Sequence, residues 1–285
     1  MTELRKPSWL IKKVAPNGAI RDVKTLLRHQ SLHTVCENAM CPNLGECFSR
    51  KTATFLIMGD VCSRHCGYCA IPSGSPAPLD PDEPERVAET AANLGLRHVV
   101  VTSVTRDDLA DGGAAHFAET IKALRRHGHG TVVEVLIPDF GASQKSLQTV
   151  LDAGPDILNH NVETVPSLFP TVRPQGDYQR SLELLERAKT RLPRGCTKSG
   201  LMVGLGETGE EVTRVMEDLR RVGCDIVTIG QYLRPSRNHL EVKHYWPPET
   251  FDEWKREGEA MGFLMVASAP FVRSSYNADQ FHPQQ

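Results

Sequence analysis

The sequence predicts an α/β fold, a partial (β/α)6 TIM-like barrel, and three observations support it. Short β-rich runs alternate with longer runs of helical periodicity along most of the chain. Repeated strand–helix–strand units imply a parallel sheet with right-handed crossovers. Roughly six such units are present, which is fewer than the eight that close a full barrel. We therefore expect a partly open barrel, followed by one extra strand and a tail.

The predicted strands are short apolar runs bounded by turn residues, at 54–58, 98–102, 132–137, 156–160, 200–203, 225–229 and 263–267. Predicted helices lie between them, where apolar residues recur at helical spacing over 87–94, 117–124, 147–151, 182–188 and 212–219. Thr208 and Glu211 form a capping-box pattern at one helix start, and Gly95 and Gly223 stand where helices are expected to end. Amphipathic helices of this kind are expected to cover the sheet.

The chain has 285 residues, 40% of them hydrophobic, which is enough to bury a large core. Residues 1–50 do not follow the alternation, so we expect an N-terminal extension there that wraps the barrel. The barrel itself is predicted over residues 51–265 and a C-terminal tail over residues 266–285.

The formal net charge of −2 argues against nucleic acid as a partner. No apolar run approaches the length of a membrane span, and residues 1–20 lack the apolar core of a signal peptide. We therefore expect a cytoplasmic protein without membrane contact. In that compartment the eight cysteines are expected to be reduced thiols, because disulfides belong mainly to secreted proteins.

Six of the eight cysteines form two triplets, Cys36, Cys41 and Cys47, then Cys62, Cys66 and Cys69. Each triplet has one thiolate fewer than a fully thiolate-ligated tetrahedral site needs. Each site therefore leaves a coordination position for another ligand. The second triplet directly follows the first predicted barrel strand, at the sheet edge where parallel α/β folds place their active sites.

The spacing of Cys62, Cys66 and Cys69 favours an iron–sulfur cluster. An eight-residue loop can wrap three thiolates around one cubane and leave the fourth iron without a protein ligand. That iron can then bind a small molecule through nitrogen and oxygen. The alternative is a zinc site completed by His65, but zinc motifs usually come as two separated cysteine pairs.

The motif Cys62-Ser-Arg-His-Cys66-Gly-Tyr-Cys69 resembles that of the radical S-adenosylmethionine superfamily. The resemblance implies that a [4Fe–4S] cluster binds S-adenosylmethionine at its open iron and cleaves it to a 5′-deoxyadenosyl radical. It also implies a partial barrel, and it places Tyr68 near the cofactor. The cofactors then carry the difficult chemistry, while the protein orients and shields it.

The first cysteine triplet and the C-terminal tail indicate which family within this superfamily the chain resembles. Residues 36–47 have the spacing CxxxxCxxxxxC, and residues 273–276 read Arg-Ser-Ser-Tyr. Both are similar to the lipoyl synthase family, and the resemblance covers essentially the whole chain. It implies an auxiliary [4Fe–4S] cluster carried with the help of the tail, in which Ser275, or alternatively Ser274, completes the ligand set of Cys36, Cys41 and Cys47. A hard oxygen ligand is lost more easily than a thiolate, which suits a cluster that surrenders its sulfur.

Polar residues after other predicted strands are candidates for S-adenosylmethionine and substrate contacts. Thr102 is a candidate for the methionine moiety, and Arg106 with Asp108 for positioning the substrate; the alternative is a charged surface loop. Asn161 and Glu163 are candidates for the ribose and amino groups.

Three further features follow the same barrel edge. Arg173 is a candidate for the S-adenosylmethionine carboxylate or for the substrate. Residues 200–207 resemble the glycine-rich strand that approaches adenine, although these glycines alone can also serve a tight turn. Cys196 and Cys224 lie outside both triplets and are predicted to be ordinary thiols of the core or surface.

The resemblance implies a sulfurtransferase that inserts two sulfur atoms at C6 and C8 of a protein-bound octanoyl group. Its partners are then an octanoylated lipoyl domain or glycine-cleavage H protein, and ferredoxin or flavodoxin as electron donor. One alternative is a biotin-synthase-like radical enzyme acting on a free small molecule, which leaves Cys36, Cys41 and Cys47 without a role. Another is a non-catalytic iron–sulfur carrier, which rarely needs so large a barrel or an open iron.

Overall fold

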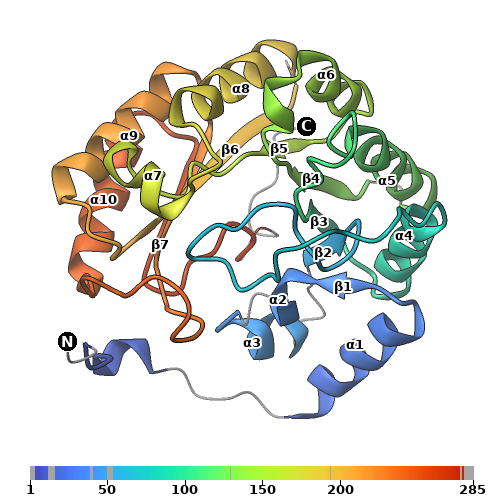
Figure 1. The fold of residues 1–285 in the computed structure, drawn as a ribbon, viewed down its shortest axis with the longest axis horizontal. Helices are drawn as coiled ribbons and strands as arrows, with labels where there is room; N and C mark the ends of the chain where they lie inside the picture. Colours follow the sequence, from blue (N-terminus) through green and yellow to red (C-terminus); the bar gives the residue numbers. More distant parts are fainter. Residues whose placement is uncertain are drawn as a thin grey trace. The chain divides into compact units, whose positions relative to one another are not determined.

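Eight strands in the order β1-β2-β3-β4-β5-β6-β7-β8 form one open sheet in the computed structural model of this chain (Figure 1). The structure describes residues 4–11, 17–38, 41–49, 54–128, 130–192, 194–276 and 278. The sheet is mostly parallel and does not close, which confirms the predicted α/β partial barrel. Residues 277 and 279–285 of the predicted tail lie outside the described residues.

The strands are β1 (His33–Thr34), β2 (Thr54–Ile57), β3 (His98–Ser103), β4 (Val132–Leu136), β5 (Ile157–Asn159), β6 (Cys196–Val203), β7 (Ile226–Gln231) and β8 (Met265–Ser268). β1 runs antiparallel to β2, whereas β2 with β3, β3 with β4, β6 with β7 and β7 with β8 are parallel pairs. All seven predicted strands are therefore present.

Two strands differ from the prediction, and each has a physical reason. β6 begins at Cys196, four residues before the predicted start, because Thr197, Lys198 and Ser199 are polar yet buried. An apolar pattern cannot reveal such a strand. β1 is only two residues long and was not predicted.

The longer helices are α1 (Asn17–His29), α4 (Glu83–Asn93), α5 (Ala114–His127), α6 (Gln144–Asp152), α8 (Tyr178–Arg191), α9 (Gly209–Arg221) and α10 (Pro248–Ala260). Short turns of helix are η1 (Ser8–Leu10), α2 (Val35–Asn38), α3 (Leu44–Ser49), η2 (Phe140–Ala142), η3 (Pro166–Leu168) and α7 (Phe169–Val172). The five predicted helical segments fall in α4, α5, α6, α8 and α9. Helix α10 was missed, because its core face is formed by Phe251, Trp254 and Gly258 and not by an aliphatic stripe.

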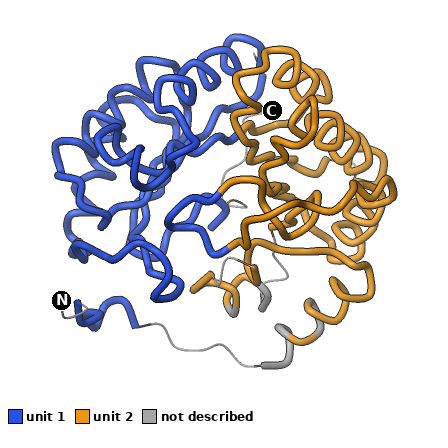
Figure 2. The backbone as a smooth tube through the Cα atoms, in the orientation of Figure 1, with its two compact units in different colours: residues 1–13, 65–70, 159–276 blue, residues 14–64, 71–158, 277–285 orange. Residues whose placement is uncertain are grey.

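The chain divides into two compact units (Figure 2). Unit 2 comprises residues 14–64, 71–158 and 277–285. Within it α5 packs against both α4 and α6, and the three helices flank β2, β3 and β4 (Figure 1). Phe55, Ile57, Val99, Phe117 and Ile121 are fully buried in its core. Burial of such side chains is worth about 1.5–3 kcal/mol each.

Unit 1 comprises residues 1–13, 65–70 and 159–276. Its core joins β6, β7 and β8 to α8, α9 and α10. Thr208 and Glu211 form the predicted capping box at the start of α9, with both reciprocal bonds present. Gly223 has a left-handed φ of 79° just after α9, and Gly95 in unit 2 has one of 66° after α4, so both predicted helix ends are confirmed.

Candidate functional site

The first cysteine triplet lies in unit 2, on two short helices and the turn between them. Cys36 belongs to α2 and Cys47 to α3, while the Cys41 N–H donates to the Cys36 carbonyl at 3.2 Å. Cys36 is buried, and this burial raises the pKa of its thiol to about 12; hydrogen bonds with Thr54 oppose the shift, and nearby Cys41 and Cys47 add to it. If Cys36 is the cluster ligand that the sequence predicts, binding must displace this proton.

The loop that carries the second triplet begins in unit 2, directly after β2. The Cys62 N–H donates to the Pro72 carbonyl at 2.8 Å, and the Cys62 carbonyl accepts from the Gly74 N–H at 2.9 Å. Two backbone N–H groups point at the sulfur itself, from Arg64 at 3.4 Å and Thr105 at 3.3 Å. Hydrogen bonds of this kind stabilise negative charge on a thiolate, which is compatible with the predicted role of Cys62 as a cluster ligand.

The remainder of this loop, residues 65–70, belongs to unit 1. The Gly67 N–H donates to the Val172 carbonyl and the Gly67 carbonyl accepts from the Leu240 N–H, each at 3.0 Å. His239 Nε2 lies 3.0 Å from the Cys69 carbonyl oxygen. A Cβ at Gly67 would lie 2.9 Å from the Leu240 side chain, so this close approach favours glycine. These contacts hold the loop through the backbone of Gly67 and Cys69.

Polar side chains after β5 gather around Tyr68 in unit 1. Asn161 Nδ2 donates to Glu163 Oε1 at 3.2 Å, and Arg173 Nη1 donates to the Asn161 carbonyl at 2.9 Å. The Tyr68 hydroxyl also bonds to Glu163. Burial raises the pKa of Tyr68 well above its usual range, and the charge of Glu163 adds to that effect. The structure therefore brings together four of the predicted cofactor-binding residues.

Glu163 has an unusual backbone that the sheet holds in place. Its φ is 71°, a left-handed value that non-glycine residues rarely adopt. Its N–H donates to the Gly200 carbonyl at 2.9 Å, and its carbonyl accepts from the Met202 N–H at 2.8 Å. Such strain persists where the surroundings over-determine it, often at ligand sites.

The stability of the cofactor-free protein is expected to depend on pH through Glu163. Burial raises the pKa of this carboxyl above 4.5, although Arg173, Asn161 and Tyr68 oppose the shift. The folded state then holds this proton more tightly than the unfolded state, so the carboxyl stabilises the fold at low pH and loses that contribution as pH rises above 4.5. Relative to wild type, Glu163→Gln should gain free energy of unfolding as pH rises.

Urea denaturation of both proteins between about pH 4 and pH 8 measures this difference. Titration of other groups cancels, because both proteins contain them. A flat or falling difference would show that the hydrogen bonds and the Arg173 charge outweigh burial.

A residue of the C-terminal tail contacts the same group of polar side chains. Asn161 Nδ2 donates to Ser274 Oγ at 3.0 Å. Asn161 is 7% exposed, and its Oδ1 has no hydrogen-bond partner in the part of the chain that the structure describes. A buried amide oxygen without a partner is costly, so it fits a ligand that carries a hydroxyl or amino donor.

Thr102, Arg106 and Asp108 follow β3 in unit 2. Thr102 Oγ1 donates to the Leu136 carbonyl at 2.8 Å, within the sheet. Arg106 is 2% exposed; its Nε and Nη2 bond to Asp108, and Nη1 bonds to the Met58 carbonyl. The Arg106 hydrogen bond lowers the pKa of Asp108. The structure therefore pairs Arg106 with Asp108, and their contact with the substrate stays a prediction.

The glycine-rich segment after β6 forms a turn. Gly204 and Gly206 have left-handed φ values of 100° and 124°. Glu207 closes the turn, because its carboxylate accepts from the Gly204 and Leu205 N–H groups and from Trp246 Nε1. The tight-turn interpretation therefore holds for these two glycines.

Cys196 and Cys224 are both buried, which confirms them as core thiols.

Three residues near Cys62 were not singled out from the sequence, namely Arg64, Asp107 and Asp139. Arg64 Nη2 lies 2.9 Å from Asp107 Oδ1 and 2.7 Å from Asp139 Oδ1. The signal that could have found them is an arginine inside a cysteine motif together with aspartates after two neighbouring strands.

No three His, Cys, Asp or Glu side chains among the described residues converge on a single ion position. A cubane cluster places each thiolate on a different iron, so its ligands need not converge in this way. The donor chemistry, thiols with N–H groups directed at one sulfur, fits such a cluster.

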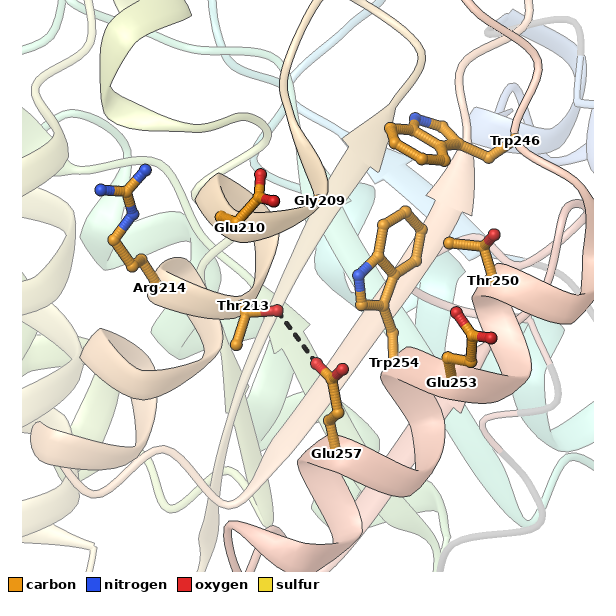
Figure 3. Close-up of a pocket in the computed structure, with 9 residues that line it drawn as sticks. All are labelled: Gly209, Glu210, Thr213, Arg214, Trp246, Thr250, Glu253, Trp254 and Glu257. Atoms are coloured by element: carbon orange, nitrogen blue, oxygen red, sulfur yellow. Dashed lines mark hydrogen bonds between the residues drawn. The ribbon is translucent and has the colours of Figure 1, made fainter.

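A pocket of about 800 Å³ lies in unit 1 between α9 and α10 (Figure 3). Trp246 and Trp254 line it, with ring centroids 5.2 Å apart, and Glu257 accepts a hydrogen bond from Thr213 at 2.9 Å. None of the predicted site residues lines this pocket.

The described part of the chain contains no helix with the length and apolar character of a membrane span.

Comparison with known proteins identifies the relatives of this chain. Residues 56–230 match the family model of the radical SAM superfamily. A lipoyl synthase from Caldanaerobacter subterraneus subsp. tengcongensis is 56% identical over 276 residues, covering 97% of this chain and 96% of that protein. A lipoyl synthase from Rubrobacter xylanophilus is 54% identical, over 96% of this chain and 86% of its own length.

Solved structures share the fold at low identity. Methylornithine synthase has a TM-score of 0.51 at 15% identity, covering 93% of this chain and 88% of that chain. Streptococcus suis SuiB bound to S-adenosylmethionine has a TM-score of 0.58 at 8% identity, covering 84% and 56%. The fold, the two cysteine triplets and the sequence identity over nearly the whole chain lead to one conclusion: the chain belongs to the lipoyl synthase family of the radical S-adenosylmethionine superfamily.

Proposed function

We propose that the protein inserts two sulfur atoms at C6 and C8 of a protein-bound octanoyl group and so makes the lipoyl cofactor. The observation that carries this proposal is the pair of cysteine triplets, each lacking a fourth ligand, in a chain 56% identical to a lipoyl synthase over 97% of its length. The cofactors are then two [4Fe–4S] clusters and S-adenosylmethionine.

Cys62, Cys66 and Cys69 are assigned as ligands of the radical-forming cluster. When bound, this cluster and S-adenosylmethionine supply a 5′-deoxyadenosyl radical that removes hydrogen from an unactivated carbon. The buried Asn161 Oδ1 accepts a ribose hydroxyl or amino donor, and the Glu163 carboxylate supports the same groups. Arg173 supplies positive charge for a carboxylate, and Tyr68 packs over the site and helps to exclude water.

Cys36, Cys41, Cys47 and Ser275 are assigned to the auxiliary cluster, the sulfur source. Ser275 is assigned from the resemblance of residues 273–276 to the family, with Ser274 as the alternative; the Ser274 hydroxyl accepts a hydrogen bond from Asn161 Nδ2 at 3.0 Å. Ser274 then anchors the tail, while its neighbour binds iron.

Replacement of each serine in turn by alanine tests this assignment. Ser275→Ala is expected to lose auxiliary iron during purification, because only three cysteines then hold that cluster. Ser274→Ala, the matched control, removes one hydrogen bond worth about 0.5–1.5 kcal/mol and should retain both clusters. Iron and sulfide analysis measures the difference, and the reverse pattern would assign Ser274 as the ligand.

The octanoyl substrate is carried by a protein, for which we propose a lipoyl domain or glycine-cleavage H protein. A low-potential reductant must deliver an electron for each radical, and ferredoxin or flavodoxin has the required chemistry. Arg106 and Asp108 are proposed to position the substrate. Each lipoyl group needs two carbon–hydrogen bonds broken, so two molecules of S-adenosylmethionine are consumed.

Anaerobic reconstitution followed by turnover on an octanoyl-lysine peptide tests the function. Lipoyl peptide should form, with two molecules of 5′-deoxyadenosine per product. Product from a free small acid with none from the peptide would favour the biotin-synthase-like alternative. Stable clusters that never cleave S-adenosylmethionine would favour an electron carrier.

A further inference from the structure

The side chain of Arg64, inside the second cysteine motif, is held by two carboxylates of unit 2. Its Nε and Nη2 bond to Asp107 at 2.7 and 2.9 Å, and its Nη1 and Nη2 bond to Asp139 at 3.1 and 2.7 Å. The Arg64 side chain is 7% exposed and that of Asp139 is fully buried. A planar guanidinium that binds two carboxylates through paired bonds is fixed in orientation as well as position.

The backbone of Arg64 is fixed by the same arrangement. Its carbonyl accepts a hydrogen bond from Ser73 Oγ at 2.9 Å, and its N–H points at Cys62 Sγ. The Arg64 N–H and carbonyl belong to the two peptide groups on either side of its Cα, so the anchored side chain and the held carbonyl together restrict rotation of the N–H away from the sulfur.

Asp107 also connects Arg64 to the second N–H group at Cys62. The Asp107 N–H donates to Ser63 Oγ at 3.1 Å, and Ser63 Oγ donates to the Thr105 carbonyl at 2.9 Å. The Ser63 N–H donates to the same carbonyl at 3.0 Å. Thr105, whose N–H points at Cys62 Sγ, is therefore held through its carbonyl by the hydrogen bonds that Ser63 and Asp107 make.

We propose that Arg64, through Asp107 and Asp139, is a positioning residue that sets the reduction potential of the radical-forming cluster. It holds two N–H groups against the sulfur of Cys62. Hydrogen bonds to cluster sulfurs withdraw electron density, which favours the reduced form and raises the potential. The inference rests on the proposed function only in that Cys62 ligates this cluster.

Arg64→Lys tests the proposal, because lysine keeps the charge and loses the planar fork. The full chain is reconstituted with both clusters and titrated with reductant, and the reduced cluster is followed by electron paramagnetic resonance. The signal that changes on addition of S-adenosylmethionine belongs to the cluster with the open iron. Its potential should fall, so that the reduced fraction at fixed low potential drops about tenfold, equivalent to about 59 mV for one electron.

Arg125→Lys is the matched control. Arg125 also pairs with an aspartate, Asp156 at 2.7 Å, although both side chains are 34% exposed, and it bonds to the Thr131 carbonyl before β4 in unit 2. This variant should keep the wild-type potential. Asp107→Asn is the milder second variant, since it leaves the Asp139 pair intact, and it is measured if Arg64→Lys does not load iron.

A wild-type potential in Arg64→Lys, or in Asp107→Asn if that variant must be used, would overturn the proposal, even if iron loading or thermal stability falls. A lower potential with unchanged iron and sulfide per chain would support it. If the wild-type protein shows no signal that responds to S-adenosylmethionine, the assignment of Cys62 fails instead, so the two failures are distinguishable.

Discussion

Replacement of Cys36, Cys41 and Cys47 by alanine is expected to abolish lipoyl formation and leave cleavage of S-adenosylmethionine intact. The three cysteines lie on α2, α3 and the turn between them, whereas Cys62, Cys66 and Cys69 belong to a separate loop after β2. If the first triplet holds the sulfur source, its loss removes the atoms to be inserted and not the means of making the radical. The reconstituted variant should hold one [4Fe–4S] cluster where wild type holds two.

Iron and sulfide content, 5′-deoxyadenosine yield and lipoyl peptide yield measure these outcomes on the same preparation. Cys196→Ala is the matched control, because this buried cysteine lies outside both triplets and should keep both clusters and full activity. Lipoyl formation at a normal rate in the triple variant would show that the sulfur comes from elsewhere.

Gly230→Ala is expected to displace the tail and deplete the auxiliary cluster. Gly230 lies in β7, and a Cβ there would stand 2.1 Å from the Val272 carbonyl oxygen and 3.0 Å from its carbonyl carbon. Real Cβ atoms do not approach backbone so closely, so the segment around Val272 must move. Residues 273–276 follow directly and include Ser275. Lipoyl formation should fall about a hundredfold, as expected for an ångström-scale misplacement.

Gly209→Ala is the control for this substitution. Gly209 begins α9 without a left-handed φ, and among the described residues no atom beyond its chain neighbours and its own helix backbone lies within 4 Å of a Cβ built there. Iron analysis and circular dichroism of both variants separate cluster loss from unfolding. A Gly230→Ala protein with two clusters and wild-type turnover would show that the tail does not pack on β7 as described.

Local patterns predicted most of the fold because they depend on neighbours in the chain. Apolar residues at helical spacing predicted α4, α5, α6, α8 and α9, and the Thr208–Glu211 pair predicted where α9 begins. The prediction of strand limits failed where polar residues, and not apolar ones, are buried in the core. The polar start of β6 is buried through partners such as Asp225, which accepts from the Thr197 N–H at 2.9 Å and lies 28 residues further along the chain.

The site divides in the same way. Both cysteine triplets and the serine pair are short motifs, so spacing and resemblance were enough to select them. The contact of Ser274 with Asn161 joins residues 113 apart, and the bonds of Arg64 to Asp107 and Asp139 span 43 and 75 residues. No local pattern records such pairs.

The amino-acid sequence alone determined the family and the order of strands and helices, and it selected the two cysteine triplets as candidate ligands, because these depend on residue type and short-range spacing. Only the tertiary structure decided that Asn161 donates to Ser274 while its buried Oδ1 has no hydrogen-bond partner among the described residues. It also decided that two N–H groups point at Cys62 Sγ. The direction of an N–H group and the burial of a side chain depend on strand ends that are distant in the chain and come together in the fold. A sequence pattern does not contain this information.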